Sequence, residues 1–313
     1  MINADDFGIG LATSAGIIHA HLHGPVNRTS VMVVTGDHVN ASVQLLDEAP
    51  QLQLGLHLVF TNVGACALAA NAASKLVDSQ RQFLSIQQLY FRCLCGKIDA
   101  SAVFDEICAQ AEKFYKLVGR APSHVDGHHH AHQFPIIRQA MLRAMRAGVL
   151  PRVTRRTVEA PGMLRAVGSC RMRRIALNML GRSASADFCR EGIEVNDCFF
   201  GVLSERNLSE ENPWEGYLAA LPPRGSVDWM VHPGFFDESL RGRDGYIEGR
   251  VRELAALTSP PITIQPAGAR TDWGADDGVN VATIGSTGRA YAHSADHRLS
   301  IMRGEESGGS TTS

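Results

Sequence analysis

The sequence lacks the features that would place this protein in a membrane, on a nucleic acid or in a disulfide-bonded scaffold. No run of about 18 apolar residues is present, so we expect no membrane span. The 30 Lys and Arg residues are balanced by 32 Asp and Glu residues, and the formal net charge of -2 leaves no basic footprint for nucleic acid. Seven cysteines are scattered without a CxxC pair, which argues against a disulfide framework and against a zinc knuckle.

The amino terminus, MINADDFG, lacks a basic segment followed by an apolar stretch, so we expect no secretory signal and a cytoplasmic location. The 313 residues are 44% hydrophobic, which is enough material for one large α/β domain. Beyond residue 261 the chain is rich in Gly, Ser, Thr, Asp and Arg and has almost no apolar periodicity. We therefore expect a folded domain over residues 1–261 and a poorly ordered tail over 262–313. The oligomeric state stays open, a homodimer included.

Apolar segments with strand-like and helix-like spacing alternate along the first 258 residues. This alternation predicts parallel strands in a barrel or an open sheet. Strands are expected at residues 2–4, 27–35, 54–58, 122–125, 149–153 and 226–231. Helices are expected at residues 11–22, 43–46, 86–94, 101–118, 135–147, 164–180 and 208–221, with a last one ending near 257.

A histidine-rich segment, HVDGHHHAH, places five histidines and one aspartate within the nine residues from His124 to His132. Imidazole is the commonest ligand for borderline transition metals and the side chain that titrates nearest neutral pH. The segment therefore indicates metal binding, proton transfer or both. A surface loop that binds metal adventitiously is the alternative. An amphipathic segment on each side puts the cluster after a strand, where α/β folds usually carry their chemistry.

Polar residues also occur at or near the ends of other expected strands. Asp5 and Asp6 follow the first strand, His57 lies in the third, and His232 follows the last in an HPG turn. All of these residues could converge at one end of the fold. One carboxylate and two imidazoles would there hold a divalent cation and leave coordination positions open for water and substrate. That arrangement is typical of hydrolytic sites. The alternatives are an aspartate that caps the next helix and a hydrogen-bonded core histidine at His57.

Four motifs in this order, NADDFG, GLHL, HVDGHHHAH and HPG, resemble the YdjC family of carbohydrate deacetylases. That family includes chitooligosaccharide deacetylases and relatives in hopanoid biosynthesis. The resemblance implies a distorted TIM-type (β/α) barrel with parallel strands, related to the polysaccharide deacetylases. It also implies a metal-dependent hydrolase that removes the N-acetyl group from an N-acetylated sugar or oligosaccharide.

The resemblance assigns roles by motif position. Asp6, His57 and His128 would bind one divalent cation, Asp5 would be the catalytic base, and His232 would be the general acid. By ligand chemistry the set suits Zn²⁺, whereas the family is compatible with Mg²⁺. Further residues are expected to bind sugar hydroxyls or to orient the metal ligands: His124, Asp126, His130, His132 and Arg152.

Two other classes of protein fit part of the pattern. A metal-dependent phosphoesterase on a similar barrel would use comparable ligands, with more carboxylates for a second metal and cationic groups for phosphate. Arg152, Arg155 and Arg156 keep that option open. A non-catalytic metal-binding protein would need neither Asp5 nor His232.

Overall fold

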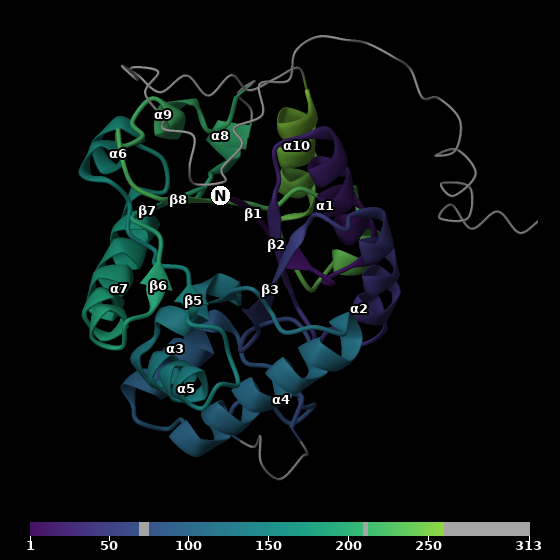
Figure 1. Cartoon of the computed structure of the whole chain (residues 1–313), viewed down its shortest axis with the longest axis vertical. Helices are drawn as coiled ribbons and strands as arrows, with labels where there is room; N and C mark the ends of the chain where they lie inside the picture. Colours follow the sequence, from purple (N-terminus) through teal and green to yellow (C-terminus); the bar gives the residue numbers. More distant parts are fainter. Residues whose placement is uncertain (69–74, 209–211, 260–313) are drawn as a thin grey trace, which may run out of the picture. The chain divides into compact units, whose positions relative to one another are not determined.

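In a computed structural model of the chain, which describes residues 1–68, 75–208 and 212–259, the strands form one parallel sheet (Figure 1). Its strand order is β6-β5-β4-β3-β2-β1-β8-β7. The eight strands are β1 (Ile2–Phe7), β2 (Arg28–Val31), β3 (Gln53–Leu58), β4 (Val125–Gly127), β5 (Val153–Thr154), β6 (Glu194–Val195), β7 (Cys198–Phe200) and β8 (Val227–Val231). The sheet curls into part of a barrel, which confirms the predicted α/β fold of the distorted TIM type.

Helices flank this sheet, and α4 packs against α5 (Figure 1). Three short 3₁₀ segments also lie among the described residues: η1 (Val43–Glu48), η2 (His128–Gln133) and η3 (Glu238–Leu240). The α-helices are α1 (Leu11–His23), α2 (Asp37–Ser42), α3 (Ile86–Leu94), α4 (Ala100–Val118), α5 (Pro135–Arg146), α6 (Pro161–Ala166), α7 (Arg171–Arg190), α8 (Glu205–Leu208), α9 (Glu215–Leu218) and α10 (Ile247–Thr258).

The central strands are buried almost throughout. Every residue of β2 and β4 is buried, and in β1 and β3 only the first residue is not. A parallel strand covered on both faces is expected to be buried in this way. Polar residues such as Asp5, His57 and Asp126 therefore lie inside the protein, where each needs a partner or a function.

Two of the helix predictions are wrong. The stretch 164–180 is divided between α6 and α7, because Val167 is extended and Cys170 adopts a left-handed conformation. Among its described residues, the stretch 208–221 holds only the last residue of α8 and the short α9. Asn212 precedes a proline, which disfavours a helical residue there.

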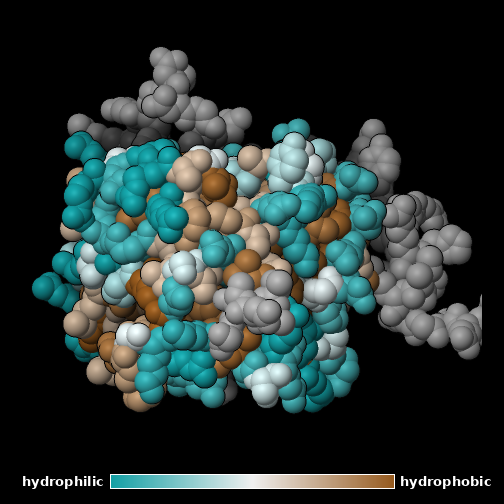
Figure 2. Space-filling model, turned by 90° about the horizontal axis from the view of Figure 1, so that it is seen from below, coloured by the Kyte–Doolittle hydropathy of each residue, from teal (hydrophilic) through white to brown (hydrophobic). Residues whose placement is uncertain are grey.

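Among the described residues, no helix combines the length and the apolar character needed to cross a bilayer. The face seen in Figure 2 is covered by hydrophilic side chains with apolar patches between them. The predicted tail over residues 262–313 lies outside the described residues.

Candidate functional site

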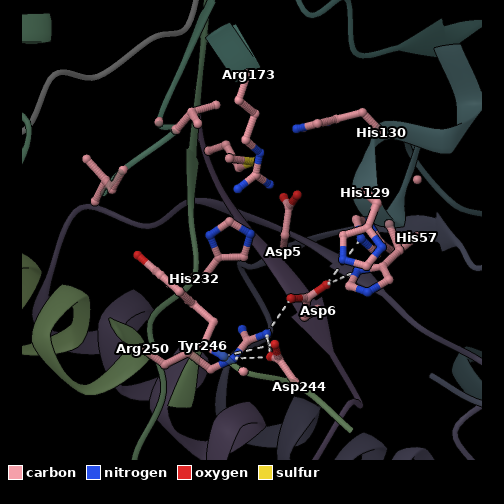
Figure 3. Close-up of a pocket in the computed structure, with 17 residues that line it drawn as sticks. Asp5, Asp6, His57, His129, His130, Arg173, His232, Asp244, Tyr246 and Arg250 are labelled. Carbon is pink, nitrogen blue, oxygen red and sulfur yellow. Dashed lines mark hydrogen bonds and ion pairs between the residues drawn. The ribbon is translucent and has the colours of Figure 1, made fainter. Parts of the chain in front are cut away.

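A cavity of about 250 Å³ lies where the strands of the sheet end (Figure 3). Its walls come from the ends of β1, β3, β4, β7 and β8, from η2, α7 and α10, and from residues 244–246. Carboxyl ends of parallel strands are the usual location of active sites in barrels. Asp5 and Asp6 both face this cavity, together with His57, His128 and His232.

An irregularity at the end of β1 lets two neighbouring aspartates reach the same cavity. The pairing of β1 with β2 shifts register between Ala4 and Phe7, and Asp6 has a φ of 71°. In regular strands adjacent side chains point to opposite faces. The left-handed backbone at Asp6, which is costly for a residue other than glycine, removes that constraint.

Asp6 lies between two imidazoles. Its Oδ1 is 3.2 Å from Nε2 of His57 and 3.1 Å from Nδ1 of His128. The potential ligand atoms of the three residues all lie within 4.8 Å of one another, and all three residues are buried. One carboxylate oxygen and two imidazole nitrogens at this spacing are a donor set that a divalent cation can bind.

The environment of His57 fits a metal ligand. Its Nδ1 is 2.6 Å from Oδ1 of Asp126 and 3.0 Å from Oγ of Ser30. Its buried Nε2 lies 3.2 Å from Oδ1 of Asp6 without the geometry of a hydrogen bond, and makes none with the other described residues. Metal-binding histidines usually donate their second N–H to a carboxylate in this way. Burial lowers the pKa of His57, but the charge and hydrogen bond of Asp126 more than offset this and raise it to about 10.

His128 enters the site through an unusual turn. It begins η2, in which His129 and His130 both have positive φ angles, of 52° and 55°. Two consecutive left-handed residues other than glycine are strained, and such strain is concentrated at functional sites. The turn brings the ring of His128 to within 5.8 Å of the ring of His57, measured between centroids.

Asp5 has a different partner from Asp6. Nη1 and Nη2 of Arg155 donate to its two carboxylate oxygens at 2.6 and 2.8 Å, and Nδ2 of Asn3 donates to its Oδ1 at 2.6 Å. Arg155 also pairs with Asp126 and Asp228, each at 3.1 Å. Two parallel bonds from a guanidinium fix the orientation of a carboxylate. Asp5 is therefore held as a separate carboxylate beside the group formed by Asp6, His57 and His128.

His232 faces the cavity with a buried carboxylate behind it. Oε2 of Glu253 accepts a hydrogen bond from the His232 backbone N–H at 2.7 Å, and Oε1 lies 3.8 Å from Nδ1 of the ring. The Tyr246 hydroxyl donates to the same Oε1 at 2.7 Å. Burial lowers the pKa of His232, but Glu253 more than offsets this, so that the pKa lies above its usual value.

The chain matches the YdjC-like protein family over residues 1–263. It belongs to this family. The four motifs therefore led to the correct family.

Relatives with known names cover most of the chain. It is 31% identical over 270 residues to chitooligosaccharide deacetylases of Yersinia pestis (strain Pestoides F) and Yersinia pseudotuberculosis serotype O:1b (strain IP 31758). In both cases the match covers 85% of this chain and 92% of the relative. Among solved structures, a protein of Enterococcus faecalis V583 described as a candidate for cellobiose-phosphate cleavage has a TM-score of 0.61 at 26% identity, covering 83% of this chain and 90% of that one.

The YdjC-like chain places two of its other histidines behind the cavity. Nε2 of His124 donates to Oδ1 of Asn3 at 3.0 Å, and burial lowers the pKa of His124 to about 3. Nε2 of His132 is 3.1 Å from the backbone oxygen of Arg155, and burial lowers its pKa to about 4. Both rings are therefore neutral and support the residues that hold Asp5.

The two remaining predicted residues, His130 and Arg152, lie in different places. His130 lines the cavity, with its ring edge-on to Phe199 at 5.4 Å between centroids. Arg152 lies outside the cavity, where it is exposed and its guanidinium donates to the backbone oxygen of Glu191. The expected role of Arg152 in binding sugar hydroxyls or orienting the metal ligands would need it at the cavity, which it does not line. Arg155, three residues later, occupies the interior.

The sequence interpretation missed other residues at the cavity or directly behind it. Arg250 and Glu253 lie on the buried face of α10, beside the apolar residues Leu254 and Leu257. Charged residues at positions that periodicity assigns to a core are a signal of function, because burying an unpaired charge is costly. Three cavity residues carried no comparable signal: Arg173, Asp244 and Tyr246. His129 also lines the cavity and lies in the histidine-rich segment, but the motifs gave it no role.

Proposed function

We propose that this chain is a carbohydrate deacetylase that uses one divalent cation to hydrolyse the N-acetyl group of an N-acetylated sugar. The names of its Yersinia relatives support this substrate class. The observation that carries the proposal is the separation of two adjacent carboxylates. Asp6 joins two histidines, whereas Asp5 is held apart by Arg155 and faces the same cavity as His232.

The cation would be held by Oδ1 of Asp6, Nε2 of His57 and Nδ1 of His128. When bound, it would polarise the acetyl carbonyl and make a nearby water more acidic. The donor set suits Zn²⁺, and Mg²⁺ is the second candidate. Asp126 keeps the Nε2 lone pair of His57 directed at the site by accepting the hydrogen bond from Nδ1.

Asp5 acts as the general base in this proposal. A carboxylate oxygen has further lone pairs beyond those that Arg155 and Asn3 use, so Asp5 can still accept a proton from the attacking water. The fork of Arg155 keeps the carboxylate from turning toward Asp6 or the cation. Positioning of this kind is what makes proton transfer efficient.

His232 acts as the general acid. Departure of an amide nitrogen as an anion is prohibitive near neutral pH, so the sugar nitrogen must gain a proton as the C–N bond breaks. Glu253 lies beside Nδ1 of His232 and raises the pKa of the ring, which favours the imidazolium. The opposite nitrogen, Nε2, is then free to donate its proton to the leaving nitrogen.

The test is acetate release from a panel of N-acetylated mono- and disaccharides. Metal-free protein should be inactive, and Mg²⁺ or Zn²⁺ added back should restore hydrolysis. Asp6→Asn should lose both the cation and the activity, whereas Asp5→Asn should lose activity alone. No acetate from any sugar with either metal would refute the proposal.

A phosphoesterase is the second candidate. Arg173 lines the cavity, and the description of the Enterococcus faecalis protein concerns a phosphorylated sugar. Two-metal phosphoesterases need a second cation site. The group that resembles one, Asp5 with His57 and Asp126, is bridged by the guanidinium of Arg155. Phosphate release from sugar phosphates without acetate release from N-acetylated sugars would favour this candidate.

A further inference from the structure

The two carboxylate oxygens of Asp6 have different partners. Oδ1 faces His57 and His128, at 3.2 and 3.1 Å. Oδ2 accepts a hydrogen bond at 2.6 Å from Nη2 of Arg250. The oxygen on the histidine side is therefore available to a cation, while the other is occupied by a guanidinium (Figure 3).

Arg250 is itself fixed by a second carboxylate. Its Nη2 and Nε donate to Oδ2 of Asp244 at 2.5 and 3.1 Å. Arg250 and Asp6 are each only 2% exposed. Asp244 lies at the cavity in the segment just before α10, and Arg250 comes from α10 itself. The chain thus forms a row of three charged groups: Asp6, Arg250 and Asp244.

Fold stability alone does not explain the ion pair between Arg250 and Asp6. A buried guanidinium already has a charge partner in Asp244, and buried ion pairs contribute little net stability because desolvation offsets the attraction. One further observation points toward the cavity. Nη1 of Arg250 is buried without a hydrogen-bond partner in the described part of the chain, and Arg250 lines the cavity.

We propose that Arg250 is a positioning residue that restricts Asp6 to one-oxygen coordination and lowers the affinity of the site for its divalent cation. The inference rests on the metal-dependent function proposed above. With Oδ2 held by Arg250, Asp6 presents only Oδ1 to the cation, and more coordination positions stay open for water and the substrate carbonyl. The positive charge of Arg250 also offsets part of the negative charge of Asp6, so the carboxylate does not fully neutralise the cation.

Charge counting gives the direction of the effect. Asp6, Arg250 and Asp244 together carry a formal charge of about -1, which becomes about -2 when Arg250 is replaced by a neutral residue. Affinity at carboxylate sites rises with the charge of the ligands. The freed oxygen of Asp6 could also bind the cation. A more fully neutralised cation is a weaker Lewis acid, so tighter binding should accompany slower turnover.

Three variants test the inference by calorimetric titration of Mg²⁺ and Zn²⁺, each alone, into metal-free full-length protein. Arg250→Gln should bind the cation at least about 10-fold more tightly and have a lower kcat, on the scale seen when groups behind metal ligands change. Asp244→Asn should bind it about 10-fold more weakly, because one negative charge is lost. Arg250→Lys keeps the charge and should stay within about 3-fold of wild type.

Arg174→Gln is the matched control. Arg174 is also buried and paired with a carboxylate, Glu159 at 2.6 Å, but it does not line the cavity. Its replacement should leave metal affinity unchanged. Weaker or unchanged binding by Arg250→Gln, or an equal gain in Arg174→Gln, would overturn the inference.

Two further outcomes have a defined meaning. If Arg250→Gln does not fold, as judged by circular dichroism, Asp244→Asn decides: weaker binding supports the inference, and unchanged or tighter binding overturns it. If wild-type protein binds neither cation, the proposed function itself fails. That result is distinct from the case in which wild type binds and only the variants behave differently.

Discussion

At the scale of single residues, two neighbouring aspartates acquire different chemistry from different partners. Asp5 receives the fork of Arg155, and Asp6 shares one oxygen with two imidazoles. Burial raises the pKa of Asp6, but Arg250 and His128 hold it well below the usual range of an aspartate. Asp6 is thus ionised at any pH near neutral, as a metal ligand must be.

Replacement of Asp5 by Asn tests the assignment of the base. The amide keeps the shape of the side chain but cannot accept the proton from water. We expect a loss of about 10²-fold or more in kcat on N-acetylated sugars, with metal affinity near that of wild type. Acetate release and metal titration measure the two quantities. Loss of the cation from Asp5→Asn would mean that Asp5 is a ligand.

The pH dependence of activity tests His232 and Glu253. Glu253 raises the pKa of His232 above its ordinary value of 6.5, so the imidazolium is fully present at low pH and is lost as pH rises through that raised pKa. Activity on amides should fall on the basic side for this reason. Glu253→Gln should move that decline to lower pH, whereas Glu253→Asp keeps the charge and should move it less.

A comparison of amide and ester substrates distinguishes a general-acid role of His232 from a structural role. Activated esters have leaving groups that need no proton, so His232→Ala should slow amide hydrolysis more than ester hydrolysis. Equal slowing of both substrate types would argue against His232 as the acid. A pH profile of Glu253→Gln that matches wild type would remove Glu253 from the proton path.

Motif residues were predictable from the sequence, whereas their partners were not. Asp6, His57 and His128 lie in short, dense motifs, and the structure brings their ligand atoms together. Arg155 lies in a basic stretch with Arg152 and Arg156, and Arg250 has no motif around it, so neither showed which aspartate it would pair with. Their partners, Asp5 and Asp6, lie 150 and 244 positions away. Only the curl of the sheet brings such residues together, and local patterns do not encode it.

At the scale of elements, the predictions succeeded where apolar spacing was regular. Helix α4 begins one residue before the predicted start at 101, and α5 ends one residue before the predicted end at 147. The segment predicted as a strand over 149–153 contributes only Val153 to β5 (Val153–Thr154). Apolar character alone did not show that its first four residues connect a helix to the sheet.

A glycine beside the cavity gives a prediction at this scale. Gly201 follows β7 with a φ of 129°, and an added Cβ would lie 2.0 Å from the backbone oxygen of Met230. Gly201→Ala should therefore strain the backbone and push β7 away from β8. We expect about 2 to 3 kcal/mol less free energy of unfolding, measured by urea denaturation.

Gly168→Ala is the control for this change. Nothing lies within 4 Å of the Cβ that would be added there. Its free energy of unfolding should stay within about 0.5 kcal/mol of wild type. Equal stability of Gly201→Ala and wild type would show that β7 can move without cost.

At the scale of the whole molecule, the last described helix contributes to both the core and the site. Leu254 and Leu257 of α10 are buried in the main core, and the same helix supplies Arg250 to the cavity and Glu253 to the buried side of His232. The folded domain therefore has to extend at least through α10. The composition of residues 262–313, rich in Gly, Ser and Thr, offers little further apolar surface to bury.

Two truncations test the domain boundary predicted at residue 261. A chain of residues 1–261 keeps α10 and should retain the melting temperature, the metal affinity and the deacetylation rate of the full chain. A chain of residues 1–245 loses Arg250, Glu253 and the apolar face of α10. It should unfold at a much lower temperature or fail to fold, because several buried apolar side chains lose their place in the core. If the 1–261 chain behaves like the 1–245 chain, the residues beyond 261 belong to the folded domain and the boundary lies further along the sequence.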